Sequence, residues 1–135
     1  MRRRLLQGNS VILAVLRSPA HRLLSGLVVE LRYTGRRTGR EYAVPVQYAR
    51  AADRLVVFPQ DAPHKTWWRN FRAPQPVTVR LARRLHSGTA RVVDRDDPGW
   101  EEAFRVYAAR WRRQAPRLTG PFVEIALGPE PDPER

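Results

Sequence analysis

The chain has 135 residues, of which 42% are hydrophobic, and it carries a formal net charge of +12. This length suits one domain with a single core, and this hydrophobic share argues against a wholly disordered chain. The sequence contains no cysteine, which excludes disulfides, thiolate nucleophiles and metal sites built on cysteine.

The positive charge is almost entirely arginine, because Lys65 is the only lysine. Such a charge attracts polyanions, namely nucleic acid, anionic lipid or phosphorylated ligands. The planar guanidinium group also binds phosphate through two parallel hydrogen bonds. The same arginine excess is typical of a GC-rich genome, so the charge alone leaves the partner open.

The N-terminal segment, residues 1–26, is predicted to be helical from about residue 9 to residue 24, with a break at Ser18 and Pro19. Its apolar run ends at Arg17 and is far shorter than the roughly 20 residues of a membrane span, with no small-residue cleavage site. We therefore expect a cytoplasmic protein whose helix caps one end of the fold. The basic ends of the helix leave contact with an anionic membrane surface open as an alternative.

Alternating apolar and polar residues predict strands over 27–33, 42–48 and 54–58. The first of these strands would place Glu30 and Arg32 on a solvated face. A turn with two glycines, 34–40, separates the first two strands. Pro45 cannot donate a hydrogen bond to a neighbouring strand, so the second strand lies at a sheet edge, is bulged, or faces a ligand.

A short helix over 64–72 carries adjacent tryptophans, Trp67 and Trp68, of which at most one can point fully inward. Strands are then predicted over 77–81, 85–93 and 122–127. Between the last two lies a long helix, which we expect to be capped by Asp97. Its apolar stripe consists of Trp100, Phe104, Tyr107 and Trp111.

These elements predict a mainly β (α+β) fold, in which residues 27–127 form a split antiparallel β-barrel of about six strands. The N-terminal helix, the short tryptophan helix and the long amphipathic helix would cover its openings. The polar, proline-rich residues 128–135 are predicted to be a disordered tail.

The turn 34–40 is the strongest candidate for a binding site. Its glycines allow backbone amides to converge on an anion, with arginine side chains and a threonine hydroxyl around them. The spacing matches neither a P-loop nor a dinucleotide fingerprint. A solvated basic hairpin turn explains the same residues equally well.

The segment 65–71 is the second candidate, because aromatic rings beside cations suit stacking on an isoalloxazine-like ring or a nucleobase. Alternatively, Trp67 and Phe71 only anchor the short helix to the barrel. His21, His64 and His86 are isolated and suggest neither a catalytic triad nor a metal site. If the chain is an enzyme, we expect a bound cofactor to carry the chemistry.

Three motifs together resemble the deazaflavin-dependent nitroreductase family, actinobacterial split-barrel proteins that use 8-hydroxy-5-deazaflavin, coenzyme F-420. They are Thr-Gly-Arg-Arg-Thr-Gly at 34–39, Val-Pro-Val at 44–46, and Trp-Trp-Arg-Asn-Phe-Arg-Ala at 67–73 before a Val-x-Val strand. The resemblance extends over about residues 27–127. The loop 59–64 before the tryptophan helix is shorter than is usual in the family.

The resemblance implies roles for individual residues. The phosphate and polyglutamate tail of the cofactor would be held by Arg36, Arg37, Thr38 and Gly39. The deazaflavin ring would lie against Pro45, Val46 and Gln47, with Trp67 as a wall. Lys65 would stand in for a lysine of the family that helps to bind the tail. Tyr107 would face the substrate as a proton donor.

The implied reaction is hydride transfer from reduced coenzyme F-420 to a small molecule, namely a quinone, a nitro compound or an activated alkene. The protein would act as a monomer or homodimer. Two alternatives remain at this point. One is a split barrel that binds flavin mononucleotide (FMN) or haem, and the other is a barrel without cofactor that binds nucleic acid through its arginines.

Overall fold

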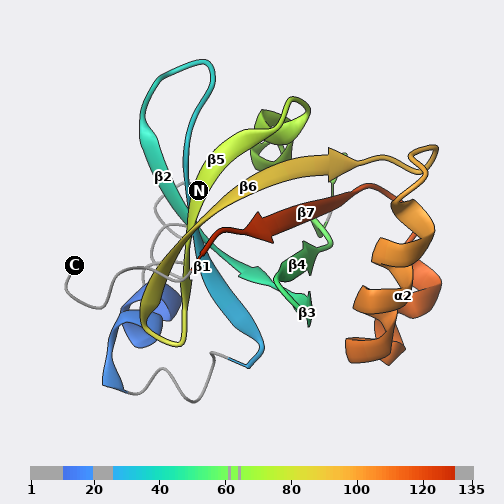
Figure 1. The fold of residues 1–135 in the computed structure, drawn as a ribbon, viewed down its shortest axis with the longest axis horizontal. Helices are drawn as coiled ribbons and strands as arrows, with labels where there is room; N and C mark the ends of the chain where they lie inside the picture. Colours follow the sequence, from blue (N-terminus) through green and yellow to red (C-terminus); the bar gives the residue numbers. More distant parts are fainter. Residues whose placement is uncertain (1–10, 20–25, 61, 64, 130–135) are drawn as a thin grey trace.

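A computed structural model describes residues 11–19, 26–60, 62–63 and 65–129. Seven strands form one antiparallel sheet in the order β2-β1-β5-β6-β7-β4-β3, which confirms a mainly β split barrel (Figure 1). The strands are β1 (Val28–Thr34), β2 (Glu41–Gln47), β3 (Ala49–Ala51), β4 (Arg54–Val57), β5 (Gln75–Leu81), β6 (Arg84–Val93) and β7 (Phe122–Leu127).

The curl of the sheet follows from its connectivity. β2 and β3 lie at opposite ends of the strand order, yet Tyr48 alone separates them in the chain. The two edges must therefore approach each other, since one residue spans less than about 4 Å. The strand predicted over 42–48 is confirmed as β2, whereas β3 was not predicted, because the chain passes to the other sheet edge at Tyr48 without a turn residue. Pro45 does lie in an edge strand, β2, opposite Glu30 of β1.

Two hydrophobic clusters stabilise the fold. The larger one fills the curl of the sheet and includes Leu31, Phe71 and Val79, none of which is exposed. The smaller one lies beneath helix α2 (Trp100–Arg110) and contains Tyr107 and Phe122. The predicted apolar stripe of the long helix is thus confirmed as the face that packs on the sheet.

The start of α2 differs from the prediction, and the helix ends one residue before Trp111, the last residue of the predicted stripe. The N-cap is Gly99, and the side chain of Asp97 instead accepts hydrogen bonds from the Gly99 amide at 2.7 Å and from Arg91 at 3.0 Å. The helix ends at Arg110, and a 3-10 helix, η3 (Arg112–Arg117), follows it. The predicted short tryptophan helix is also a 3-10 helix, η2 (Trp67–Phe71).

The solvated face predicted for β1 was wrong at Glu30, which is buried. Its side chain has 0% exposure and makes ion pairs with Arg17 at 2.8 Å, Arg80 at 3.2 Å and Arg32. Burial alone would raise the pKa of Glu30, but the hydrogen bonds and charges of Arg17 and Arg32 lower it to about 2. The carboxylate is therefore an ionised centre that joins β1, β5 and the N-terminal helix.

Residues 11–17 are helical and end at the predicted break at Ser18 and Pro19. Leu13 and Leu16 are buried, and Arg17 links the helix to Glu30. In the described part of the chain, no helix is long and apolar enough to cross a membrane. The rest of the predicted N-terminal helix and most of the predicted tail lie outside the described residues, so the boundaries of these segments stay predictions.

Candidate functional site

The β1–β2 turn has a conformation that depends on its two glycines. The Gly35 amide donates to the Arg40 carbonyl at 2.8 Å, and the Gly39 amide donates to the Gly35 carbonyl at 2.9 Å. Gly39 has a φ of 68°, which favours glycine, and a Cβ atom at Gly35 would lie 2.7 Å from the ring of Tyr42. The backbone that carries the turn arginines therefore has a specific, hydrogen-bonded conformation.

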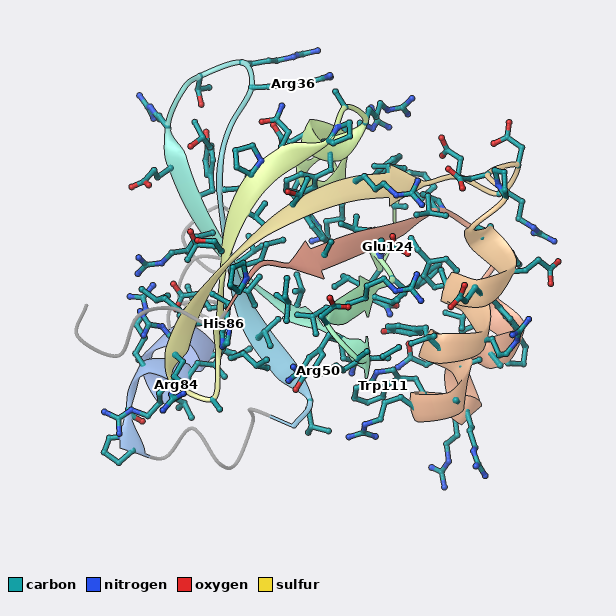
Figure 2. All side chains as sticks on the ribbon, viewed as in Figure 1. Arg36, Arg50, Arg84, His86, Trp111 and Glu124 are labelled. Carbon is teal, nitrogen blue, oxygen red and sulfur yellow. The ribbon has the colours of Figure 1, made fainter. Side chains whose placement is uncertain are left out.

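This turn and η2 together enclose a cavity of about 390 Å³, which we call the arginine cavity. Its lining residues are Tyr33, Gly35, Arg36, Arg37, Thr38, Tyr42, Thr66, Trp67, Arg69 and Asn70. Figure 2 shows Arg36 at the outer tip of the β1–β2 hairpin. This one cavity is lined by four residues that were predicted to bind the cofactor, namely Arg36, Arg37, Thr38 and Trp67. Gly39 is in the turn but not in the lining.

The arginine cavity is cationic without internal compensation. Three arginines line it, and no carboxylate stands among its described lining residues. Arg69 Nε is a buried atom that has no hydrogen-bond partner in the described part of the protein. Buried donors are normally paired, so this donor and the two turn arginines fit a ligand that brings phosphate or carboxylate oxygens.

Arg69 and Asn70 are among the lining residues of this cavity that were not predicted to bind the cofactor, although both lie in the candidate segment 65–71. Asn70 accepts a hydrogen bond from the Arg36 amide at 2.9 Å and donates to the Trp67 carbonyl at 2.8 Å, so it joins the turn to η2. Both residues belong to the Trp-Trp-Arg-Asn-Phe motif, which was the only available signal for them. Their spacing from the turn gives no indication that they meet it in space.

A second cavity of about 210 Å³, the edge cavity, lies between β2 and the end of β4. Its lining residues are Val44, Pro45, Val46, Gln47, Val57, Phe58, Pro59, Gln60, Lys65 and Trp67. All four residues that were predicted to surround a planar ring line this one cavity. Lys65, which was predicted to stand in for a lysine that helps to bind the tail, lines it as well. Trp67 is half-buried and also lines the arginine cavity, whereas Trp68 points inward and donates to the Ala62 carbonyl at 3.0 Å.

A family model described as F420H(2)-dependent quinone reductase matches residues 17–118, which is most of the chain and includes both cavities. The chain belongs to this family. The predicted resemblance to deazaflavin-dependent reductases is thereby confirmed, and coenzyme F-420 is the cofactor. No protein of curated function matches the chain in sequence.

Solved structures with the same fold are distant in sequence. An F420-H2 dependent reductase, FDR-A, is 21% identical with a TM-score of 0.53, and the match covers 73% of this chain and 92% of that one. A protein described as a domain-swapped dimer is 19% identical with a TM-score of 0.54, covering 83% and 97%. The haem storage protein HutZ of Vibrio cholerae is 16% identical with a TM-score of 0.54, covering 86% and 92%. At these identities the likeness confirms the split-barrel fold.

The donor set of this F420H(2)-dependent reductase suits its cofactor. The cationic arginine cavity, where Arg69 Nε is buried and has no hydrogen-bond partner among the described residues, adjoins the edge cavity, whose lining combines Trp67 and other apolar side chains with two glutamines and a lysine. A cationic cavity next to one walled by a tryptophan matches a molecule with an anionic tail and a planar ring. In the described residues, no group of three or more histidine, aspartate and glutamate side chains could hold a metal ion.

A third cavity of about 480 Å³, the outer cavity, adjoins the edge cavity. The two share Pro45, Gln47, Phe58 and Gln60 in their linings. The outer cavity is otherwise lined by Ile12, Val28, Gln114, Arg117 and Leu118. The reductase therefore has three hollows in series, joined first at Trp67 and then at Gln47.

Tyr107, the predicted proton donor, lines none of these three cavities. Its side chain is fully buried, and its hydroxyl donates to Gln47 Oε1 at 3.2 Å. Burial raises the pKa of Tyr107 to about 12, although a hydrogen bond from the Gln60 side chain acts in the opposite direction. Tyr107 is connected to the cavities through its hydrogen bond to Gln47 and through Phe58, whose ring centroid lies 6.2 Å from that of Tyr107, and its catalytic role stays a prediction.

Proposed function

We propose that this protein binds coenzyme F-420 with its anionic tail in the arginine cavity and its ring in the edge cavity, and reduces a small acceptor in the outer cavity. The observation that carries the proposal is the series of three adjoining cavities, cationic at one end and open to a further ligand at the other. When bound in its reduced form, the cofactor supplies a hydride.

The tail would be held by Arg36, Arg37 and Arg69, with Thr38 and Gly39 shaping the turn. Thr38 Oγ1 accepts a hydrogen bond from the Arg40 amide at 3.2 Å and lies 3.1 Å from the Tyr42 hydroxyl, so it helps to fix the loop. A loop whose backbone is already held in place loses little conformational entropy when its arginines bind phosphate. The turn thus prepares the anion site before the ligand arrives.

The ring would lie between β2 and Trp67. Pro45 has no N–H group and the Val46 side chain is buried. Neither residue therefore has a free backbone donor or an exposed side chain that would keep a planar aromatic ligand from lying against β2. Lys65 places a cation beside Trp67 in the same cavity. The edge position of β2 leaves this side of the strand free of a neighbouring strand.

The acceptor is proposed to be a quinone, a nitro compound or an activated alkene. The lining of the outer cavity combines apolar side chains, among them Ile12, Val28 and Leu118, with three glutamines and Arg117, which suits a small planar molecule with polar substituents. A cytoplasmic location, contact with a membrane surface through the N-terminal helix, and a monomeric or homodimeric state belong to the same proposal and remain to be measured.

The proposal is tested by titrating the purified protein with oxidised coenzyme F-420 and with FMN while following the fluorescence of each ligand. Binding of the deazaflavin with at least about tenfold preference, or 1.4 kcal/mol, supports it. Oxidation of reduced coenzyme F-420 is then measured with one quinone, one nitroaromatic compound and one activated alkene. Preference for FMN, or no oxidation with any acceptor, would contradict it.

A further inference from the structure

Four side chains form one hydrogen-bond network where the edge and outer cavities meet. Gln60 Nε2 donates to Gln114 Oε1 at 3.1 Å, and Gln114 Nε2 donates to Gln47 Oε1 at 3.0 Å. Tyr107 donates to the same Gln47 oxygen at 3.2 Å. The network therefore converges on one atom, Gln47 Oε1.

This convergence fixes the orientation of the Gln47 amide. An amide oxygen has two acceptor sites, and Tyr107 and Gln114 occupy both. The Gln47 NH₂ group must then point away from these two donors. Within the described residues no acceptor is recorded for Gln47 Nε2, while Gln47 lines both the edge and the outer cavity. The result is an oriented N–H donor at the boundary between two ligand-binding hollows.

We propose that Gln47 Nε2 donates a hydrogen bond to an oxygen atom of the acceptor substrate, and that Tyr107 is the positioning residue that keeps this amide from flipping. The inference rests on the proposed function. It narrows the acceptor to planar molecules in which the reducible system is conjugated to a carbonyl or nitro oxygen. An alkene activated by a group without such an oxygen is a poor substrate.

The chemistry explains why a donor is useful at this position. For a quinone or enone, the acceptor gains a hydride from the reduced deazaflavin, which is thereby oxidised. The two added electrons leave a negative charge on the conjugated oxygen, which then takes a proton from solvent. A fixed N–H group stabilises this developing charge more than it stabilises the neutral substrate. Tyr107, with a buried hydroxyl that is already donating to Gln47, does not supply this proton.

The first test measures binding without turnover. Chromone, a flat bicyclic ketone, and naphthalene, a hydrocarbon of similar size, are titrated against the wild type, Gln47→Glu and Gln75→Glu. Gln47→Glu keeps an oxygen that accepts from Tyr107 and Gln114 but removes the donor. Gln75→Glu makes the same chemical change on β5, at a residue that lines none of the three cavities.

We expect chromone affinity to fall roughly tenfold in Gln47→Glu, the usual effect of losing one buried hydrogen bond. In Gln75→Glu it should stay within about twofold of the wild type, as for a substitution outside the site. Naphthalene affinity should not distinguish the variants. Equal chromone affinity in Gln47→Glu and Gln75→Glu, a matching loss for naphthalene, or no chromone binding to the wild type overturns the inference.

The second test separates the two roles by kinetics. In Gln47→Glu, quinone reduction should fall about 100-fold, mainly in kcat, as it does when a donor to a developing oxyanion is removed. Tyr107→Phe keeps the ring and loses the hydroxyl, so the amide can flip, and kcat should fall by about tenfold or less. Melting temperatures confirm that each variant is folded. An unchanged kcat in folded Gln47→Glu overturns the inference.

The two proposals fail in different ways. If the wild type does not oxidise reduced coenzyme F-420 with any acceptor, the proposed function fails, and the chromone series still decides whether Gln47 donates to a carbonyl oxygen. If the wild type is active but the Gln47 variant has the same kcat and chromone affinity, only the role of Gln47 fails.

Discussion

Two groups of three arginines in this protein have opposite surroundings. Arg17, Arg32 and Arg80 surround Glu30, a fully buried carboxylate that neutralises part of their charge. The second group, Arg36, Arg37 and Arg69, lines a cavity with no carboxylate among its described lining residues. Residue type is the same in both groups, but the first group surrounds an internal counter-ion and the second does not, among the described residues.

The comparison separates a structural use of arginine from a binding use. Where the fold supplies the anion, the arginines join β1, β5 and the N-terminal helix and need no ligand. Where the fold leaves the anion out, the guanidinium groups remain available for phosphate or carboxylate oxygens. The net charge of +12 therefore does not by itself locate the site. The arginines that lack a nearby carboxylate among the described residues do locate it.

The largest effect is expected from removing the internal counter-ion. Glu30→Gln keeps the shape of the side chain but leaves three arginines around a neutral buried group, so it should lower the free energy of unfolding by about 3 kcal/mol. Urea denaturation at neutral pH measures this. Glu102→Gln is the matched control, because Glu102 pairs with Arg54 at 2.6 Å but is 57% exposed. Its effect should stay below about 1 kcal/mol, and equal effects of the two substitutions would contradict the structural role of Glu30.

The second group should respond in ligand binding rather than in stability. Arg37→Ala is expected to weaken coenzyme F-420 binding by roughly 1.5–3 kcal/mol, the usual range for a hydrogen bond to a charged group. The free energy of unfolding should change by less than about 0.5 kcal/mol. Arg105→Ala, an exposed arginine of α2, removes the same charge elsewhere and serves as the control. An equal loss of affinity in both variants would show that the overall positive charge, and not direct contacts in the arginine cavity, accounts for the binding.

The Glu30 group also predicts a pH dependence of stability. The pKa of Glu30 is lowered to about 2 in the folded protein from 4.5, so its contribution is complete above pH 4.5 and is lost as the pH falls towards 2. The difference in unfolding free energy between the wild type and Glu30→Gln should therefore shrink from about pH 6 to about pH 3. A difference that is constant over this range would show that the ion pairs are not its source.

The smallest effect concerns the link between the turn and η2. Asn70→Ala removes the acceptor for the Arg36 amide and should weaken coenzyme F-420 binding by about 1 kcal/mol, since the turn loses one of its fixed contacts. Fluorescence titration measures the change, and hydrogen exchange of the Arg36 amide checks its cause. Affinity and exchange rate that are both unchanged would show that the turn is held without Asn70.

The elements with local patterns could be predicted from the sequence. The β7 strand, the apolar stripe of α2 and the glycine turn depend on residues close together in the chain, and all three are confirmed. The predicted turn and ring residues, apart from Gly39, also line adjoining cavities, because each motif forms one lining segment. Of the two tryptophans, Trp68 is the buried one, as the helix geometry requires.

What failed depends on contacts between distant parts of the chain. Glu30 looked solvated because its partners Arg17 and Arg80 are 13 and 50 residues away. β3 was missed because Tyr48, which separates it from β2, is an ordinary strand residue. The hydrogen bond from the Tyr107 hydroxyl to Gln47, 60 residues earlier, could not be predicted either, and the role that the family resemblance implies for Tyr107 stays a prediction. None of these contacts leaves a periodic signal in the sequence.

The central claim is that the arginine cavity binds the anionic tail of the cofactor. The most direct measurement titrates wild type and Arg37→Ala with coenzyme F-420 and with the 8-hydroxy-5-deazaflavin chromophore that lacks the phosphate and glutamates. We predict that Arg37→Ala weakens coenzyme F-420 binding by at least about tenfold and leaves binding of the bare chromophore within about twofold. An equal loss for both ligands, or no loss for either, would contradict the claim.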